Sequence, residues 1–291
     1  MKTIERDDAA GMAEAETTSE APPPSWPGWG IATAICLRFW SRLPVPLLPG
    51  ESDGHGIPDF REVPRALPFA ALVIAAPAAL VALSAGLAGL SGFVVAALAL
   101  TTMALTTGAF HEDGLADTAD GLFGGPTPER RLEIMKDSRI GSYGALALGL
   151  SLLLRAGLIA MILDRSGAWT AAAALLAAAP WSRAEGLFML ATQPPARNTG
   201  AAAAVGQPTV LTARIALGLS LFLATGIGLA AQMPIAGLLI GFALAHGAAA
   251  VLSRMARHLI GGQTGDILGA AQQLAEIAIY LGIALMLRPG L

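Results

Sequence analysis

One uncharged apolar run constrains the fold of this chain more than any other feature. Residues 66–110 contain no Asp, Glu, Lys or Arg over 45 positions. A helix needs about 20 apolar residues to cross about 30 Å of hydrocarbon, so the run is too long for one membrane span and suits two. Residues 89–92 (GLSG) provide a turn between them. The run therefore predicts a helical hairpin that crosses a membrane twice.

Composition and further apolar segments extend this prediction to the whole chain. Of 291 residues, 54% are hydrophobic and 13% are charged, which is about half the charged share of a soluble domain. Five more segments have the length of a span: residues 143–163, 168–190, 210–230, 234–252 and 267–287. The sequence thus predicts an all-α polytopic integral membrane helical bundle with about seven transmembrane helices. Buried helices of a soluble all-α protein are the rejected alternative.

The N-terminal segment differs in character from the rest. Residues 1–29 hold six acidic side chains and end in the Pro-rich stretch APPPSWPGWG, a composition that predicts a disordered acidic tail. Residues 31–43 (IATAICLRFWSRL) carry Arg38 and Arg42 beside an apolar face, which is the pattern of a helix lying in the membrane interface. A soluble amphipathic helix would look similar. The sequence therefore places the membrane-embedded domain at residues 30–291.

Counting turns across the predicted spans assigns the loops to two sides of the membrane. The three long polar segments, residues 112–142, 191–209 and 253–266, all fall on the same side. They carry Lys and Arg in excess over the opposite loops, and such an excess marks the cytoplasmic side. We therefore expect the active face in the cytoplasm. The net charge of -3 and the lack of a basic stripe argue against a nucleic-acid partner.

The densest acid cluster of the chain follows the apolar run directly. Continuing the second span as a helix through residue 121 places Asp113, Asp117 and Asp120 on one stripe, within about 60° of one another. Three such carboxylates repel unless a cation lies between them, and oxygen ligands suit Mg²⁺ or Mn²⁺. Glu112 points to a different side of the helix and is a further candidate metal ligand. A solvated helix end is the alternative.

Glycines and cations flank this stripe. The glycines at positions 114, 121, 124 and 125 remove side chains around the stripe and are expected to leave room for backbone and a bulky ligand to approach. Lys136 and Arg139 flank Asp137 after a short predicted amphipathic helix. A carboxylate for metal beside cations for phosphate is the arrangement that phosphoryl transfer requires. A plain cytoplasmic loop with the usual positive bias would also hold these cations.

Two further loops supply candidates for substrate binding. The glycine-rich stretch GGQTGDILGA at residues 261–270 brings Gly265 and Asp266 to the start of a predicted span. Backbone amides there can approach phosphate, and Asp266 can meet a metal or a ribose hydroxyl. Arg197 lies in another loop of the same side. A simple turn is the alternative for the glycine stretch.

Ionisable residues inside the predicted spans are costly in lipid and indicate function by default. Arg183 is expected to reach a substrate phosphate from the fourth span. Arg155 and Glu276 lie deeper, and a structural ion pair between them is a possibility that the sequence leaves open. His246 stands on an apolar face and is expected to be a core histidine.

Five motifs together carry a resemblance to a known family. They are HEDGLADTADGLFGG at residues 111–125, KDSRIG at 136–141, RLPVP at 42–46, PAR at 195–197 with Gly200, and GGQTGD at 261–266. This pattern resembles the cobalamin synthases, the adenosylcobinamide-GDP ribazoletransferases. The likeness extends over residues 35–285, and the acidic tail is the main departure from it.

The resemblance implies an integral enzyme of a bacterial inner membrane that builds the nucleotide loop of coenzyme B12. Such an enzyme joins adenosylcobinamide-GDP to alpha-ribazole, or to its 5'-phosphate, and releases GMP with Mg²⁺ as cofactor. The expected catalytic residues are Asp113, Asp117, Asp120 and Asp137. The sequence leaves open whether the protein forms a homo-oligomer.

Two other functions compete with this one. A CDP-alcohol phosphotransferase-like phospholipid synthase also uses aspartates at a helix end, but its motif has an Arg after the Ala where this chain has Asp117. A transporter would explain the charges inside the spans. Against it, the second half of the chain shows no visible repeat of the first.

Overall fold

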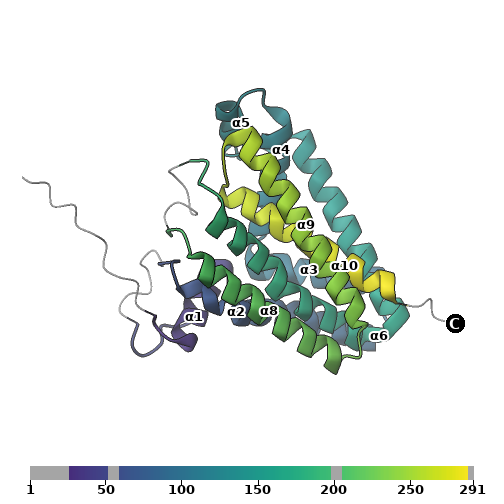
Figure 1. The fold of residues 1–291 in the computed structure, drawn as a ribbon. Helices are drawn as coiled ribbons and strands as arrows, with labels where there is room; N and C mark the ends of the chain where they lie inside the picture. Colours follow the sequence, from purple (N-terminus) through teal and green to yellow (C-terminus); the bar gives the residue numbers. More distant parts are fainter. Residues whose placement is uncertain (1–25, 52–58, 198–204, 288–291) are drawn as a thin grey trace, which may run out of the picture.

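A computed structural model describes residues 26–51, 59–197 and 205–287 (Figure 1). Most of the expected acidic tail lies outside these residues, so its disorder stays a prediction. The regular structure of the described ranges is helical, and their only strand-like pairing is an isolated bridge between Pro195 and Gln263. The protein is thus an all-α membrane protein, as its composition predicts.

The helices follow the predicted segments closely. In chain order they are α1 (Trp29–Trp40), a short 3-10 turn η1 (Val63–Ala66), α2 (Leu67–Leu87), α3 (Gly92–Thr107), α4 (Phe110–Gly124), α5 (Pro128–Ile134), α6 (Ser142–Thr192), α8 (Val210–Ala230), α9 (Ile235–Ile260) and α10 (Gly265–Met286). Five of them, counting η1 with α2, are long and apolar enough to cross a membrane: α2, α6, α8, α9 and α10. The bent pair of α3 and α4 makes a sixth if it counts as one span.

α6 accounts for two of the predicted spans. It has 51 residues, far more than one crossing needs, and Gly167 interrupts it with non-helical angles (φ 83, ψ 173). The expected segments 143–163 and 168–190 are the two arms on either side of this break. The arms meet near the α6 label in Figure 1 and run back along the bundle separately.

The second predicted span differs from the expectation. A helix continuing through residue 121 was predicted, but α3 ends at Thr107 and α4 leaves it at 91°. Gly108 (φ 70) and Ala109 (φ 56) both adopt left-handed angles, which end a helix. The prediction of one continuous helix was therefore wrong. The spacing of the aspartates survives, because α4 contains all three of them.

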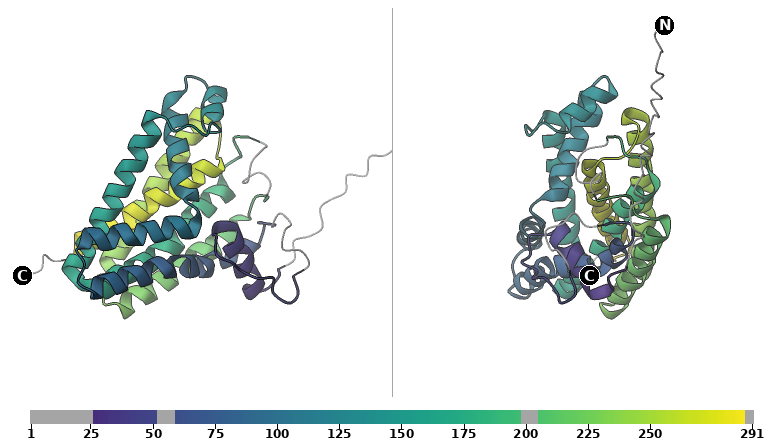
Figure 2. Two further views of the ribbon diagram at one scale, coloured as in Figure 1. Left: turned by 180° about the vertical axis from the view of Figure 1, so that it is seen from behind. Right: turned by 90° about the vertical axis from the view of Figure 1, so that its left-hand side faces the viewer.

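Contacts between segments that are far apart in the sequence define two ends of the bundle. At one end, Arg131 Nη1 donates to the carbonyl oxygen of Leu259 at 3.2 Å. At the same end, the N–H of Ala196 donates to the carbonyl oxygen of Gln263 at 2.8 Å. At the other end, Arg165 reaches the carbonyl of Ala284 at 3.4 Å. The first end lies at the upper left of Figure 1 and the second at the lower right, as Figure 2 also shows. The long polar segments thus share one end, as the turn counting predicts.

Candidate active site at the end of the bundle

The acid stripe of α4 meets residues from two other polar segments. Asp117 is half-buried and is repelled by the charges of Asp113, Asp266 and Asp120, while Arg197 attracts it. Arg197 also pairs with Asp266, at 3.2 Å between Nη2 and Oδ2. The fold therefore brings together, at one place, candidates that lie far apart in the sequence.

Glycine contacts explain how α4 comes so close to α10. A Cβ on Gly114 would lie 2.9 Å from the carbonyl oxygen of Asp266, and one on Gly269 would lie 3.4 Å from the Cα of His111. Gly121 and Gly125 pack in the same way on Arg131, whose backbone would lie 3.0 Å and 2.9 Å from their Cβ atoms. The expectation that these three glycines of the acid motif let backbone approach is confirmed. Room for a bulky ligand stays a prediction.

Backbone pairing holds Arg197 and Asp266 in place. The N–H of Gln263 donates to the carbonyl of Pro194 at 2.9 Å, opposite the bond from Ala196 described above. Thr264 caps α10 by accepting from the N–H of Ile267 at 3.3 Å, and its hydroxyl donates to Asp266 Oδ2 at 3.2 Å. The loop that carries Arg197 and the start of α10 thus form one unit.

Asp120 has a structural task that its spacing does not reveal. Its carboxylate is buried, and its two oxygens accept from the N–H groups of Gly141 at 2.7 Å and Gly144 at 2.8 Å. These groups belong to the start of α6, where a helix leaves N–H groups without partners. Asp120 therefore anchors α6 to α4. A role in metal binding or catalysis stays a prediction.

Glu112 points away from the stripe, into a buried charge network. Its Oε1 lies 3.1 Å from Arg155 Nη1 and accepts from Gln273 at 3.0 Å. Glu276 pairs with the same Arg155 at 3.4 Å and with Arg183 at 3.8 Å. The ion pair between Arg155 and Glu276 is confirmed, and Glu112 extends it. Two acids and two arginines balance one another there, as buried charges in a membrane require.

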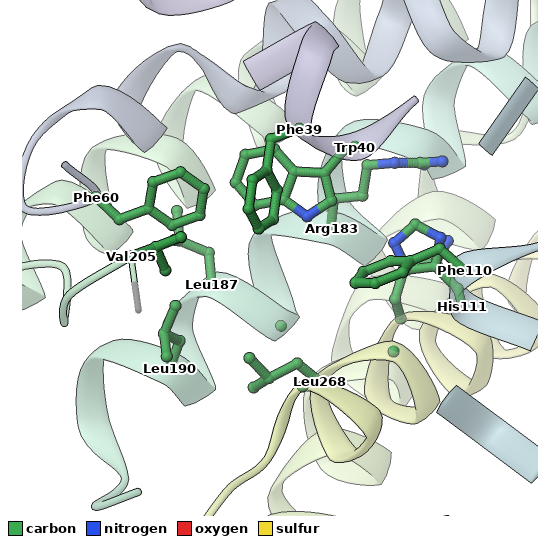
Figure 3. A pocket seen from close by; sticks show the side chains of 14 residues that line it. Phe39, Trp40, Phe60, Phe110, His111, Arg183, Leu187, Leu190, Val205 and Leu268 are labelled. Carbon is green, nitrogen blue, oxygen red and sulfur yellow. The ribbon is translucent and has the colours of Figure 1, made fainter. Parts of the chain in front are cut away.

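Arg183 also lines an aromatic pocket beside this network. Figure 3 shows Phe39, Trp40 and Phe60 on one side of the pocket and Phe110 with His111 on the other. Trp40 and Phe60 stack with their ring centroids 4.8 Å apart. This pocket was not predicted from the sequence, although Phe39 and Trp40 are separated from the RLPVP motif only by Ser41.

The remaining candidates differ in their surroundings. Asp137 accepts from Arg139 at 2.6 Å, and this hydrogen bond lowers the pKa of the Asp137 carboxyl to about 2. Lys136 is exposed beside them, and Gly265 lines the aromatic pocket. His246 is exposed and reaches Glu185 at 3.2 Å, so the expectation of a core histidine was wrong.

The chemistry of the donors decides which cation would fit. In the described part of the chain, no three His, Cys, Asp or Glu side chains converge closely enough to hold a metal ion alone. Mg²⁺ in phosphoryl-transfer sites is usually held by one or two carboxylates together with substrate phosphates and water. The mutually repelling Asp113 and Asp117 fit an ion that the substrate helps to bind.

Comparison with known proteins decides the family. The family model for cobalamin-5-phosphate synthase matches residues 32–284. The chain belongs to the cobalamin-5-phosphate synthase family. It is 46% identical over 260 residues to the adenosylcobinamide-GDP ribazoletransferase of Azorhizobium caulinodans, covering 87% of this chain and 95% of that one. It is 47% identical over 250 residues to that of Bradyrhizobium diazoefficiens, covering 85% and 90%. No solved structure matches.

Proposed function

We propose that this cobalamin-5-phosphate synthase family member joins adenosylcobinamide-GDP to alpha-ribazole, or to its 5'-phosphate, and releases GMP. The observation that carries this is the meeting of the acid stripe with Asp266 and Arg197. Asp113 and Asp117 could hold a metal ion together with the diphosphate, and the nearby Arg197 could bind one of its phosphate groups. The names and close similarity of the relatives support the same reaction.

The residues divide the work by charge. Asp113 and Asp117 would hold Mg²⁺, with Asp266 beside them and Asp120 fixing the helix. The ion supplies neutralisation of the negative charge on the diphosphate. Arg197 orients a phosphate group, and Lys136, Arg139 and Arg183 are further candidates for this task.

The reaction exchanges one phosphorus–oxygen bond for another. A ribose hydroxyl that is free in alpha-ribazole and in its 5'-phosphate alike attacks the phosphorus next to cobinamide. The bond from that phosphorus to the oxygen of the GMP phosphate breaks, so that a phosphodiester forms and GMP leaves. The proton of the attacking hydroxyl passes to a carboxylate of the acid cluster. Fixed placement of both substrates by these side chains supplies much of the rate. We place this site on the cytoplasmic face of a bacterial inner membrane.

The substitution Asp117→Asn tests this function. It keeps the shape of the side chain and removes one charge next to the diphosphate, so turnover should fall about 10²- to 10³-fold. The Mg²⁺ concentration for half-maximal rate should rise. The measurement is GMP release from adenosylcobinamide-GDP by membranes with matched protein abundance, against Mg²⁺ concentration.

Glu129→Gln is the control, because Glu129 is an exposed acid of α5 on the same end of the bundle. It should leave turnover and metal dependence unchanged. Near-normal turnover in Asp117→Asn would contradict the proposed site. Absence of GMP release from the wild type would favour the phospholipid synthase or the transporter.

A further inference from the structure

A polar cleft beside α4 is lined by Asp113 and by residues that have no role in the function described so far. Its volume is about 520 Å³, within the range of small-molecule sites. Its walls are the end of α1 with the residues that follow it, and the bend between α3 and α4. Phe39 and Phe110, both labelled in Figure 3, line the aromatic pocket and also this cleft, so the two cavities are neighbours.

Two contacts hold Arg42 at this cleft, one of its backbone and one of its side chain, and both are made with the bend between α3 and α4. Its N–H donates to the carbonyl of Thr106 at 2.7 Å, which ties it to the last turn of α3. A Cβ on Gly108 would lie 2.6 Å from Arg42 Nε. The glycine therefore serves both the left-handed angle of the bend and the close passage of the arginine side chain.

The charged residues of the cleft differ in their partners. Arg38 pairs with Glu51 and also donates to the carbonyl of Pro46 at 3.0 Å, so its charge is already used. Arg42 and Asp113 are both exposed, and neither forms an ion pair with another described residue. A cation and a carboxylate thus line the same cleft without neutralising each other. A ligand that carries negative charge fits beside Arg42.

We propose that Arg42 binds a phosphate oxygen of the diphosphate substrate, in the cleft that it shares with Asp113. The proposal rests on the proposed function, since it assigns a further binding residue to the same reaction. A planar guanidinium offers two parallel N–H donors to a phosphate, a geometry that a lysine does not reproduce. Arg42 therefore contributes to binding adenosylcobinamide-GDP rather than the nucleoside.

The substitution Arg42→Met tests this assignment, because methionine keeps an apolar stem over Gly108 and removes the donors. The KM for adenosylcobinamide-GDP should rise about 10- to 100-fold, the cost of hydrogen bonds to a charged group. The KM for alpha-ribazole should stay within roughly twofold. Arg42→Lys should restore part of the loss, and Arg130→Met, at an exposed arginine of α5, should change neither constant.

A labelling experiment gives a second readout that does not depend on turnover. Ala109 lines the cleft and is half-buried. Cys36 is the one cysteine of the sequence, so Ala109→Cys in a Cys36→Ser background leaves a single thiol, which lies in the cleft. Adenosylcobinamide-GDP should slow its reaction with a maleimide, and adding Arg42→Met should abolish this protection at the same concentration.

The outcomes separate this proposal from the function on which it rests. An unchanged KM in Arg42→Met, equal rises for both substrates, or labelling that the substrate does not slow would overturn the role of Arg42. If Arg42→Met fails to accumulate in membranes, the protection of the thiol introduced by Ala109→Cys decides alone. Failure of the proposed function would show instead as a wild type that releases no GMP.

Discussion

Asp117 and Asp120 are one helical turn apart on the same stripe, yet their surroundings differ. Asp117 faces three other carboxylates, whereas Asp120 is buried against the two N–H groups of Gly141 and Gly144. The carboxylates around Asp117 repel one another, and a bound cation would relieve this repulsion. The hydrogen bonds of Asp120 stabilise the fold. Identical residue types at regular spacing therefore have different tasks.

This difference predicts opposite effects on stability. Asp120→Asn leaves one side-chain oxygen for the N–H groups of Gly141 and Gly144, so one buried N–H loses its partner. This loss should lower the free energy of unfolding by about 1–3 kcal/mol. The melting temperature in detergent should fall by several degrees. Asp117→Asn is the matched control and should melt at or above the wild-type temperature, since it removes a repelled charge. Equal melting of Asp120→Asn and the wild type would contradict the anchoring role.

The sequence predicts the stripe but not this division. The spacing of Asp113, Asp117 and Asp120 needs only the period of a helix, and the structure preserves it. The partners of Asp120 lie 21 and 24 residues away, and the bonds of Glu112 to Arg155 and Gln273 span 43 and 161 residues. Such contacts depend on tertiary packing, which the spacing of residues along one helix does not predict.

At the scale of elements, the site depends on how closely α4 approaches α10. Gly114→Ala would place a methyl group 2.9 Å from the carbonyl oxygen of Asp266 and 3.2 Å from its Cα, so a backbone must move. A displacement of this size in a reacting site should lower GMP release about 10- to 100-fold.

Gly149→Ala in α6 is the control for this prediction, because its Cβ would have nothing within 4 Å. It should keep full activity and gain a little helix stability. The prediction fails if Gly114→Ala releases GMP at the wild-type rate.

Helix number and order were predictable because they need only apolar length. The break between α3 and α4 was not, although Gly108 stood in the sequence as a signal. A single glycine in an apolar run is tolerated within many helices. The left-handed angle of Ala109, which its residue type does not predict, completes the break.

At the scale of the molecule, the two ends of the bundle predict a labelling pattern in intact cells. Single cysteines at Ser138 and His258, both exposed at the end that carries the site, should resist a membrane-impermeant maleimide in a Cys36→Ser background. A cysteine at Leu90, exposed in the turn at the opposite end, should react. Labelling at Ser138 or His258 from outside would reverse the assigned orientation.

α10 is the last helix of the described residues, and it supplies Asp266 to Arg197, Gln273 to α4 and Glu276 to α6. A ribosome builds the chain from the N-terminus, so a nascent chain carries the acid helix long before these partners exist. Until α10 emerges, Arg155 lacks Glu276, and Arg197 lacks Asp266. Translation must therefore pass residue 276 before the chain can assemble a working site.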